Sequence, residues 1–132
     1  SDSEPTADVT IDVSSSDAGE GTVNTASLVF TASNWNTPQT VTVTGVDDAV
    51  DDGDQAYSIV LAAATSSDSN YSGINPTDVV VSNTDDDTLS LSINDITITE
   101  IDAGSNTVTF TLSLAASTSV DVTVDYASSN DT

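Results

Sequence analysis

The chain has 132 residues, of which 22 are acidic, and it contains no lysine, arginine, histidine or cysteine, so its formal net charge is −22. Such a chain repels the phosphate backbone of a nucleic acid and an anionic membrane surface, and it has no apolar run long enough to insert into a bilayer. It offers no disulfide, no thiolate or imidazole metal ligand and no base that would activate a serine, so we expect a protein that is not an enzyme.

Alternation of apolar and polar residues predicts a series of β-strands, each with one buried and one solvated face. A net charge this high is also typical of a disordered chain, but a disordered acidic tail would not keep so strict an alternation. The polar partners are mostly threonine, which suits a pleated, half-buried surface. In chain order, the alternating segments are Val9–Val13, Val41–Val43, Tyr57–Leu61, Leu89–Ile93, Val108–Leu114 and Val120–Tyr126.

Turn-forming residues separate these segments, and no segment has the pattern of a convincing helix. Short strands with regularly spaced turns indicate an all-β fold of the antiparallel sandwich type. The predicted turns are Asp17–Gly21, Asn34–Pro38, Asp51–Asp54, Ser72–Pro76 and Asp102–Gly104.

One sequence segment occurs twice. Asp8–Asp17 (DVTIDVSSSD) resembles Asp121–Asn130 (DVTVDYASSN), and the two copies begin 113 residues apart, at positions 8 and 121. A sandwich of this kind needs about 100 residues, so the spacing corresponds to one module. We therefore expect a tandem repeat cut out of phase. Residues 1–87 would form the C-terminal part of one module without its first strands, and residues 88–132 the N-terminal strands of the next.

Three parts of the chain share a pattern of strands and acidic loops with a known family. They are Leu28–Asp48, Asp47–Leu61 and the Asp85–Asp87 terminus, followed by Ile96–Glu100, Thr109–Leu114 and Val122–Tyr126 as the first strands of a new module. Together these segments resemble Calx-beta modules, the immunoglobulin-like calcium-binding β-sandwiches of sodium–calcium exchangers, integrin β4 and many bacterial surface proteins. The resemblance implies an immunoglobulin-like antiparallel β-sandwich, calcium as the bound ion and an extracellular or cell-surface location.

Aspartates gather in two clusters, one between residues 47 and 54 and one at residues 85–87. Calcium is a hard cation that takes six to eight oxygen ligands, and this chain has no cationic side chain to neutralise crowded carboxylates. An EF-hand loop starting at Asp48 does not fit, because Val50 and Ile59 would stand where oxygen ligands are needed.

The resemblance places both clusters at one tip of the sandwich and implies two further ligands, Asp17 in the first module and Glu100 in the second. The alternative interpretation, that the acidic loops are solvated surface, stays open at this point. The predicted calcium ligands are Asp17, Asp47, Asp48, Asp51, Asp52, Asp54, Asp85, Asp86, Asp87 and Glu100.

These observations predict a structural calcium-binding repeat module of a secreted or cell-surface fibre, filament or large adhesin, in which Ca²⁺ rigidifies the junction between modules. The expected partners are neighbouring copies or modules of the same protein, arranged head to tail. Strands 88–132 of one copy would complete residues 1–87 of another by strand addition, if the chain is not a slice of a much longer polypeptide.

The alternative function is an adhesin module that recognises a cell-surface glycan or protein. Trp35 could stack on a sugar, although a structural role at the end of the sandwich beside Pro38 competes with it. Tyr71, in a loop of Ser, Asn and Gly, is either an exposed contact or a loop anchor.

Overall fold

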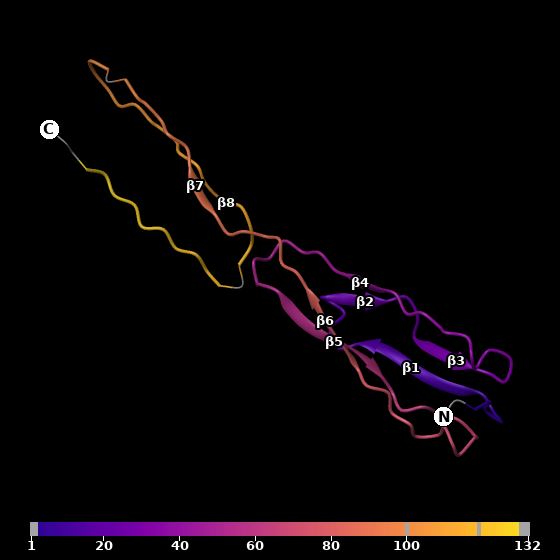
Figure 1. Cartoon of the computed structure of the whole chain (residues 1–132). Coiled ribbons are helices and arrows are strands. Elements are labelled where there is room, and N and C mark those ends of the chain that lie inside the picture. Colours follow the sequence, from indigo (N-terminus) through magenta and orange to yellow (C-terminus); the bar gives the residue numbers. More distant parts are fainter. Residues whose placement is uncertain (1–2, 100, 119, 130–132) are drawn as a thin grey trace. The chain divides into compact units, whose positions relative to one another are not determined.

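The computed structural model describes residues 3–99, 101–118 and 120–129, and within these ranges it contains antiparallel β-sheets and no helix (Figure 1). The predicted all-β class is therefore confirmed. None of the described residues belongs to a helix that is long and apolar enough to cross a membrane. The chain divides into two compact units, which we call unit 1 (Ser1–Asp48 with Asp54–Thr84) and unit 2 (Ala49–Gly53 with Asp85–Thr132).

Unit 1 contains a four-stranded antiparallel sheet in the order β3-β1-β5-β6 and a separate two-stranded antiparallel sheet of β2 and β4. Strand β1 is central because its first half pairs with β3, from Val9 to Asp12, and its second half pairs with β5, from Val13 to Ser15. The strands are β1 (Val9–Ser15), β2 (Gly21–Val23), β3 (Ser27–Phe30), β4 (Val43–Gly45), β5 (Gln55–Leu61) and β6 (Val79–Asn83).

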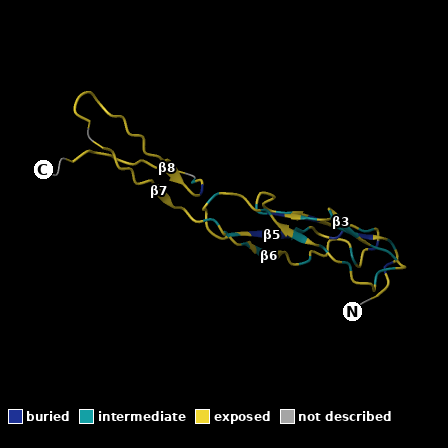
Figure 2. Cartoon of the chain, turned by 90° about the horizontal axis from the view of Figure 1, so that it is seen from above, coloured by how far each residue is buried: buried dark blue, intermediate teal, exposed yellow. Residues whose placement is uncertain are grey.

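The core of unit 1 follows from the alternation in the sequence, since every second residue of β1 and β5 points to the same face. Val13, Tyr57 and Ile59 are buried and form one cluster. Figure 2 shows the buried part of β5 in dark blue. Val23 of β2 and Val43 of β4 pack against this cluster. The two sheets of unit 1 therefore share a hydrophobic core.

Unit 2 contains one short antiparallel pair, β7 (Leu91–Ile93) with β8 (Leu112–Leu114). The segment Ala49–Gly53 joins it through a parallel bridge between Val50 and Ser117. The amide of Ser117 donates to the carbonyl of Ala49 at 3.0 Å, and the Ser117 hydroxyl donates to the same carbonyl at 2.7 Å. Ala116 is buried and Val50 is half-buried, whereas the large apolar side chains between residues 89 and 126 are exposed.

The strand predictions are accurate for the two central strands of unit 1, overlap β4 only at Val43, and are too long in unit 2. Val9–Val13 and Tyr57–Leu61 lie within β1 and β5, whereas Val108–Leu114 contracts to the three residues of β8. The expected strand at Val120–Tyr126 is wrong for this structure, because residues 120–129 contain no assigned strand. Alternation gives a segment a buried face, but a strand also needs a neighbour to accept and donate backbone hydrogen bonds.

Candidate metal centre

The turn between β1 and β2 positions the first acidic side chains. The backbone carbonyl of Asp17 accepts from the amides of Glu20 at 3.3 Å and Gly21 at 3.1 Å. The Asp17 carboxylate accepts from the amide of Gly19 at 3.0 Å, which closes an Asx turn. Asp17, a predicted ligand, thus shapes the turn that presents Glu20.

Three chain segments meet around Glu20. Its backbone carbonyl accepts from the amide of Val46 at 3.0 Å, directly after β4. The side-chain amide of Asn83, the last residue of β6, donates to Glu20 Oε2 at 3.2 Å and to the carbonyl of Val46 at 2.7 Å. These bonds hold the half-buried Glu20 carboxylate against the segment that leads into the acidic loop.

Carboxylate oxygens of Glu20 and Asp48 lie within 4.8 Å of each other in unit 1. Glu20, Asp48 and Asp52 each offer a carboxylate oxygen that could hold a metal ion. Asp52 follows Asp48 by four residues and belongs to the part of the loop assigned to unit 2. Carboxylates of this kind are the ligands that calcium and other hard cations prefer.

In unit 2, the carboxylate of Asp85 accepts hydrogen bonds from three backbone amides. Its Oδ2 accepts from the amides of Asp52 at 3.0 Å and Gly53 at 2.6 Å, and its Oδ1 accepts from the amide of Asp87 at 2.9 Å. The amides of Asp87, Gly53 and Asp52 hold the pKa of Asp85 below its usual value of 3.8, against a smaller opposing effect of burial. Asp85 therefore ties the Ala49–Gly53 segment to the start of the second sequence module.

The remaining predicted ligands are distributed over both units. Asp51 Oδ2 accepts from the amide of Leu89 at 2.8 Å within unit 2. Asp47 and Asp54 are exposed residues of unit 1. Asp86 is exposed, Asp87 is half-buried, and Glu100 lies outside the described residues.

Of the predicted ligands in unit 1, Asp48 lies beside another carboxylate, and its neighbour Glu20 was missed in the sequence. Glu20 belongs to the predicted turn Asp17–Gly21, so it was placed correctly in a loop without being recognised as a ligand. The available signal was its position as the last residue before β2, at the same end of unit 1 as the carboxyl end of β4.

The fold and this centre define an all-β protein with antiparallel sheets and acidic groups that could hold a metal ion. Comparison with known proteins adds no closer identification, because no family model, no curated protein and no solved structure matches the chain.

Proposed function

We propose that this chain is part of a calcium-binding structural repeat, similar to a Calx-beta module, in a secreted or cell-surface fibre, filament or large adhesin. The observation that carries the proposal is the approach of the Glu20 and Asp48 carboxylates to within 4.8 Å in a chain that has no lysine, arginine or histidine. Two like charges at this separation repel, and an external divalent cation relieves that repulsion.

The chemistry of the available donors favours calcium over other metals. Zinc, copper and iron sites generally use histidine or cysteine, and the sequence contains neither. Calcium accepts carboxylate and backbone carbonyl oxygens in flexible geometry. Glu20 and Asp48 would be the first ligands, and Asp47 and Asp54, the other loop aspartates of unit 1, are available to complete the shell.

The position of the acidic residues along the chain suggests what calcium does. The chain passes between its two units at residues 48–49, 53–54 and 84–85, and aspartates occur at each of these points. A calcium ion held by the acidic loop would restrict the motion of these connections and stiffen the junction. Affinities of extracellular modules are weak, about 10⁻⁴–10⁻³ M, and match the calcium concentration outside cells.

A calorimetric calcium titration of the purified chain, combined with thermal melts in calcium and in chelator, tests the proposal. At about 100 times its dissociation constant, one bound ion adds roughly 2.7 kcal/mol to the free energy of unfolding. That amount corresponds to a rise in melting temperature of roughly 10–20 °C for a unit of this size. The double change Glu20→Gln with Asp48→Asn should weaken calcium binding at least about tenfold, which is 1.4 kcal/mol.

Asp8→Asn is the matched control, because it removes a charge from an exposed position before β1. It should leave the calcium affinity unchanged. Identical melting curves in calcium and chelator, or an unchanged titration for the Glu20 and Asp48 variant, would contradict the proposed centre.

The alternative function, recognition of a glycan or protein by an adhesin module, is favoured by one observation. Trp35 and Tyr71, the two aromatic residues considered for it, line the same apolar groove of unit 1. A carbohydrate that stacks on both rings would protect Trp35 from quenching, and a glycan array probed with the labelled chain would detect it.

A further inference from the structure

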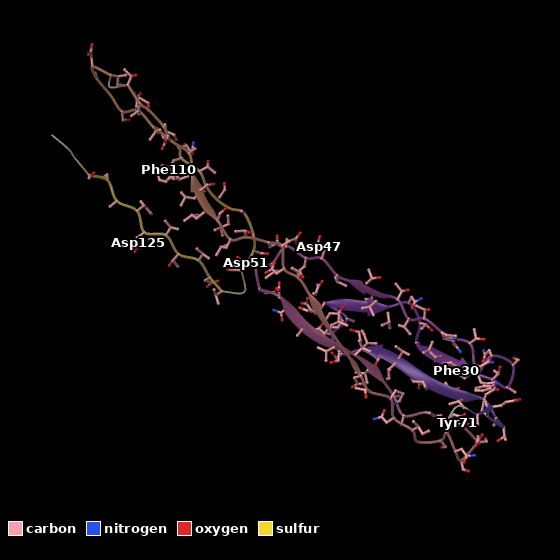
Figure 3. The ribbon with its side chains drawn as sticks, viewed as in Figure 1. Phe30, Asp47, Asp51, Tyr71, Phe110 and Asp125 are labelled. Atoms are coloured by element: carbon pink, nitrogen blue, oxygen red, sulfur yellow. The ribbon has the colours of Figure 1, made fainter. Side chains whose placement is uncertain are left out.

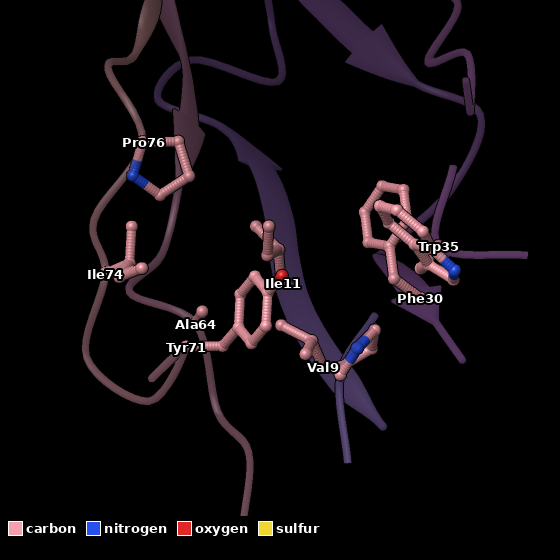
Figure 4. A pocket seen from close by; sticks show the side chains of 9 residues that line it. Val9, Ile11, Phe30, Trp35, Ala64, Tyr71, Ile74 and Pro76 are labelled. Atoms are coloured by element: carbon pink, nitrogen blue, oxygen red, sulfur yellow. The ribbon is translucent and has the colours of Figure 1, made fainter. Parts of the chain in front are cut away.

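Unit 1 has an open apolar groove of about 240 Å³ at the end of its four-stranded sheet where β1 begins. Its floor is formed by Val9 and Ile11 of β1. Phe30 and Trp35 stand on one side of these residues and Tyr71 and Ile74 on the other (Figure 4). The labelled Phe30 and Tyr71 lie at the same end of unit 1 in the full view (Figure 3).

The groove exists because the second sheet covers only part of the first. Val23 of β2 and Val43 of β4 pack over Val13, Tyr57 and Ile59. They do not line the groove over the Val9 end of the same face. In the described part of the chain no side chain is less than 2 % exposed. The sheet of unit 1 thus presents an apolar surface that a further layer of structure would bury.

Unit 2 has the complementary feature, apolar strands without a layer to cover them. Leu91, Ile93, Phe110, Leu112 and Leu114 are between 40 % and 59 % exposed and alternate with polar residues. Phe110 is among the exposed side chains drawn on this hairpin (Figure 3). Single exposed apolar residues are ordinary, but such a series along paired strands marks an interaction surface.

The sequence repeat relates these two surfaces. It places Val122 and Tyr126 at the positions of Val9 and Val13 in β1. Val9 and Val13 are 5 % and 4 % exposed, whereas Val122 and Tyr126 are 45 % and 88 % exposed. The same type of strand is therefore buried in unit 1 and exposed in unit 2.

The repeat also gives the order of strands within a module. In unit 2 the strands β7 and β8 come directly before the segment that repeats β1. A hairpin of the β7–β8 type, with an alternating apolar face, is thus the element that precedes a strand of the β1 type in unit 2.

We propose that the apolar face of the β7–β8 hairpin of one copy docks into the groove of unit 1 of a second copy, with Phe110 and Leu112 packing against Ile11 and Ile74. Each copy then offers a hairpin at one surface and a groove at another, so the contact is heterologous and repeats head to tail. The contact is apolar and does not depend on the calcium centre.

Exchange of residues 120–126 for β1 of the second copy is less favourable. The exchange would bury Val122 and Tyr126 but would expose Val9 and Val13 of the displaced strand. It would also place Tyr126 where Val13 packs against Tyr57. Docking of the hairpin displaces no strand of unit 1, so the whole apolar contact contributes to association.

Two variants test the direction of the contact. Phe110→Asp removes the hairpin surface and leaves the groove intact. Ile74→Asp blocks the groove at a position that is already 53 % exposed and leaves the hairpin intact. Thr109→Asp adds the same charge at the residue next to Phe110, on the polar face of that segment, and is the matched control. Masses are measured by light scattering in about 0.5 M NaCl with chelator, where repulsion between the acidic chains is screened within a few ångströms.

The unmodified chain and Thr109→Asp should form species above the chain mass of 13.4 kDa, whereas Phe110→Asp and Ile74→Asp should each be monomeric. Mixing the two monomeric variants should restore one contact and give a 1:1 complex of twice that mass. The far-ultraviolet circular dichroism and thermal melt of each variant check that it stays folded.

A monomeric unmodified chain would overturn the proposal and leave the groove to the glycan interpretation. Association that survives Ile74→Asp but not Phe110→Asp would also overturn it, because it would show the hairpins pairing with each other. Loss of calcium binding in the variants of the metal centre has no bearing on these masses, so the two proposals succeed or fail separately.

Discussion

The phenol group of Tyr57 in β5 lies directly over the α-carbon of Gly21, the first residue of β2. A β-carbon built on Gly21 would overlap the hydroxyl oxygen and the adjoining ring carbons of Tyr57. Tyr57 belongs to the core cluster of unit 1, and Gly21 follows the turn that presents Glu20. This contact fixes the distance between the two sheets next to the candidate metal centre.

Gly21→Ala should therefore destabilise unit 1 by about 1–3 kcal/mol, the usual range for forcing an extra carbon into a packed site. The free energy of unfolding can be measured by denaturant titration, with Trp35, the single tryptophan of the chain, as the probe of unit 1. In a double-mutant cycle with Tyr57→Leu, the effects of the two changes should be clearly less than additive. Additive effects would show that the steric contact is not the cause.

The sequence predicted the strands that have neighbours on both sides. Val9–Val13 and Tyr57–Leu61 were recognised because their alternating residues fill the shared core and their strands lie inside the sheet. The strand β2, of three residues, is too short to give an alternating pattern. Val79–Val81 of β6 are consecutive valines, which do not alternate. Val120–Tyr126 alternates without forming a strand. Alternation indicates that a segment has one apolar face, but it does not show that a neighbouring strand pairs with the segment.

The candidate site was predicted only in part, for a different reason. The loop of residues 47–54 was found because its aspartates are close in the sequence. The approach of Glu20 to Asp48 depends on pairings between distant segments, such as Gly21 with Gly45 in β2–β4 and Gln55 with Asn83 in β5–β6. The pairing of distant strands cannot be read from a single sequence, so Glu20 was recognised as a possible metal ligand only in the structure.

Asp68 provides a second prediction, on the acid stability of unit 1. This side chain is buried, and it accepts from the amide of Thr6 at 2.9 Å on Oδ2 and from the amide of Asn70 at 2.9 Å on Oδ1. These two amides, with Thr6 first, lower the pKa of Asp68 from its ordinary 3.8, while burial acts in the opposite direction. Because the folded pKa is lowered, the contribution of Asp68 to stability is complete above about pH 4 and is lost as the pH falls through the folded pKa.

Asp68→Asn should lower the melting temperature of unit 1 at neutral pH, because asparagine has one acceptor oxygen and would turn an amide donor toward one of the two backbone amides. The variant should also lose less stability than the unmodified protein between pH 5 and about pH 2. Thermal melts followed by Trp35 fluorescence measure both effects. Asp8→Asn removes an exposed charge and should retain the original acid dependence, and a shared pH profile for all three proteins would contradict the assignment to Asp68.

Asp85 gives the corresponding prediction for unit 2. Its lowered pKa implies that the amides of Asp87, Gly53 and Asp52 bind the ionised carboxylate at any pH well above 3.8. The stabilisation is present above the unfolded pKa and is lost as the pH falls through the folded one. The amide proton of Gly53 should therefore titrate with a midpoint below 3.8 in NMR spectra, and Asp85→Asn should abolish this titration. The Asp86→Asn change, at an exposed neighbour, should leave it in place. A midpoint at or above 3.8 in the unmodified chain would contradict the bonding described for Asp85.

The last prediction concerns Asn83, which links Glu20 to the carbonyl of Val46. The absence of a side chain at Gly45 leaves room for the Asn83 amide, whose oxygen would lie 2.7 Å from a β-carbon at that position. Asn83→Asp removes the donor to both oxygens and adds a carboxylate beside Glu20. Without calcium, the loss of two hydrogen bonds at about 0.5–1.5 kcal/mol each, together with the new repulsion, should lower the melting temperature clearly.

In the proposed calcium centre the same variant offers the ion an additional oxygen ligand, so the rise in melting temperature on adding calcium should be larger than in the unmodified chain. Asn83→Ala is the matched control, because it removes the same donor without adding a charge, and its response to calcium should not exceed that of the unmodified protein. An equal calcium response in Asn83→Asp and Asn83→Ala would place the ion away from Glu20, since only a carboxylate within reach of the ion changes the strength of binding.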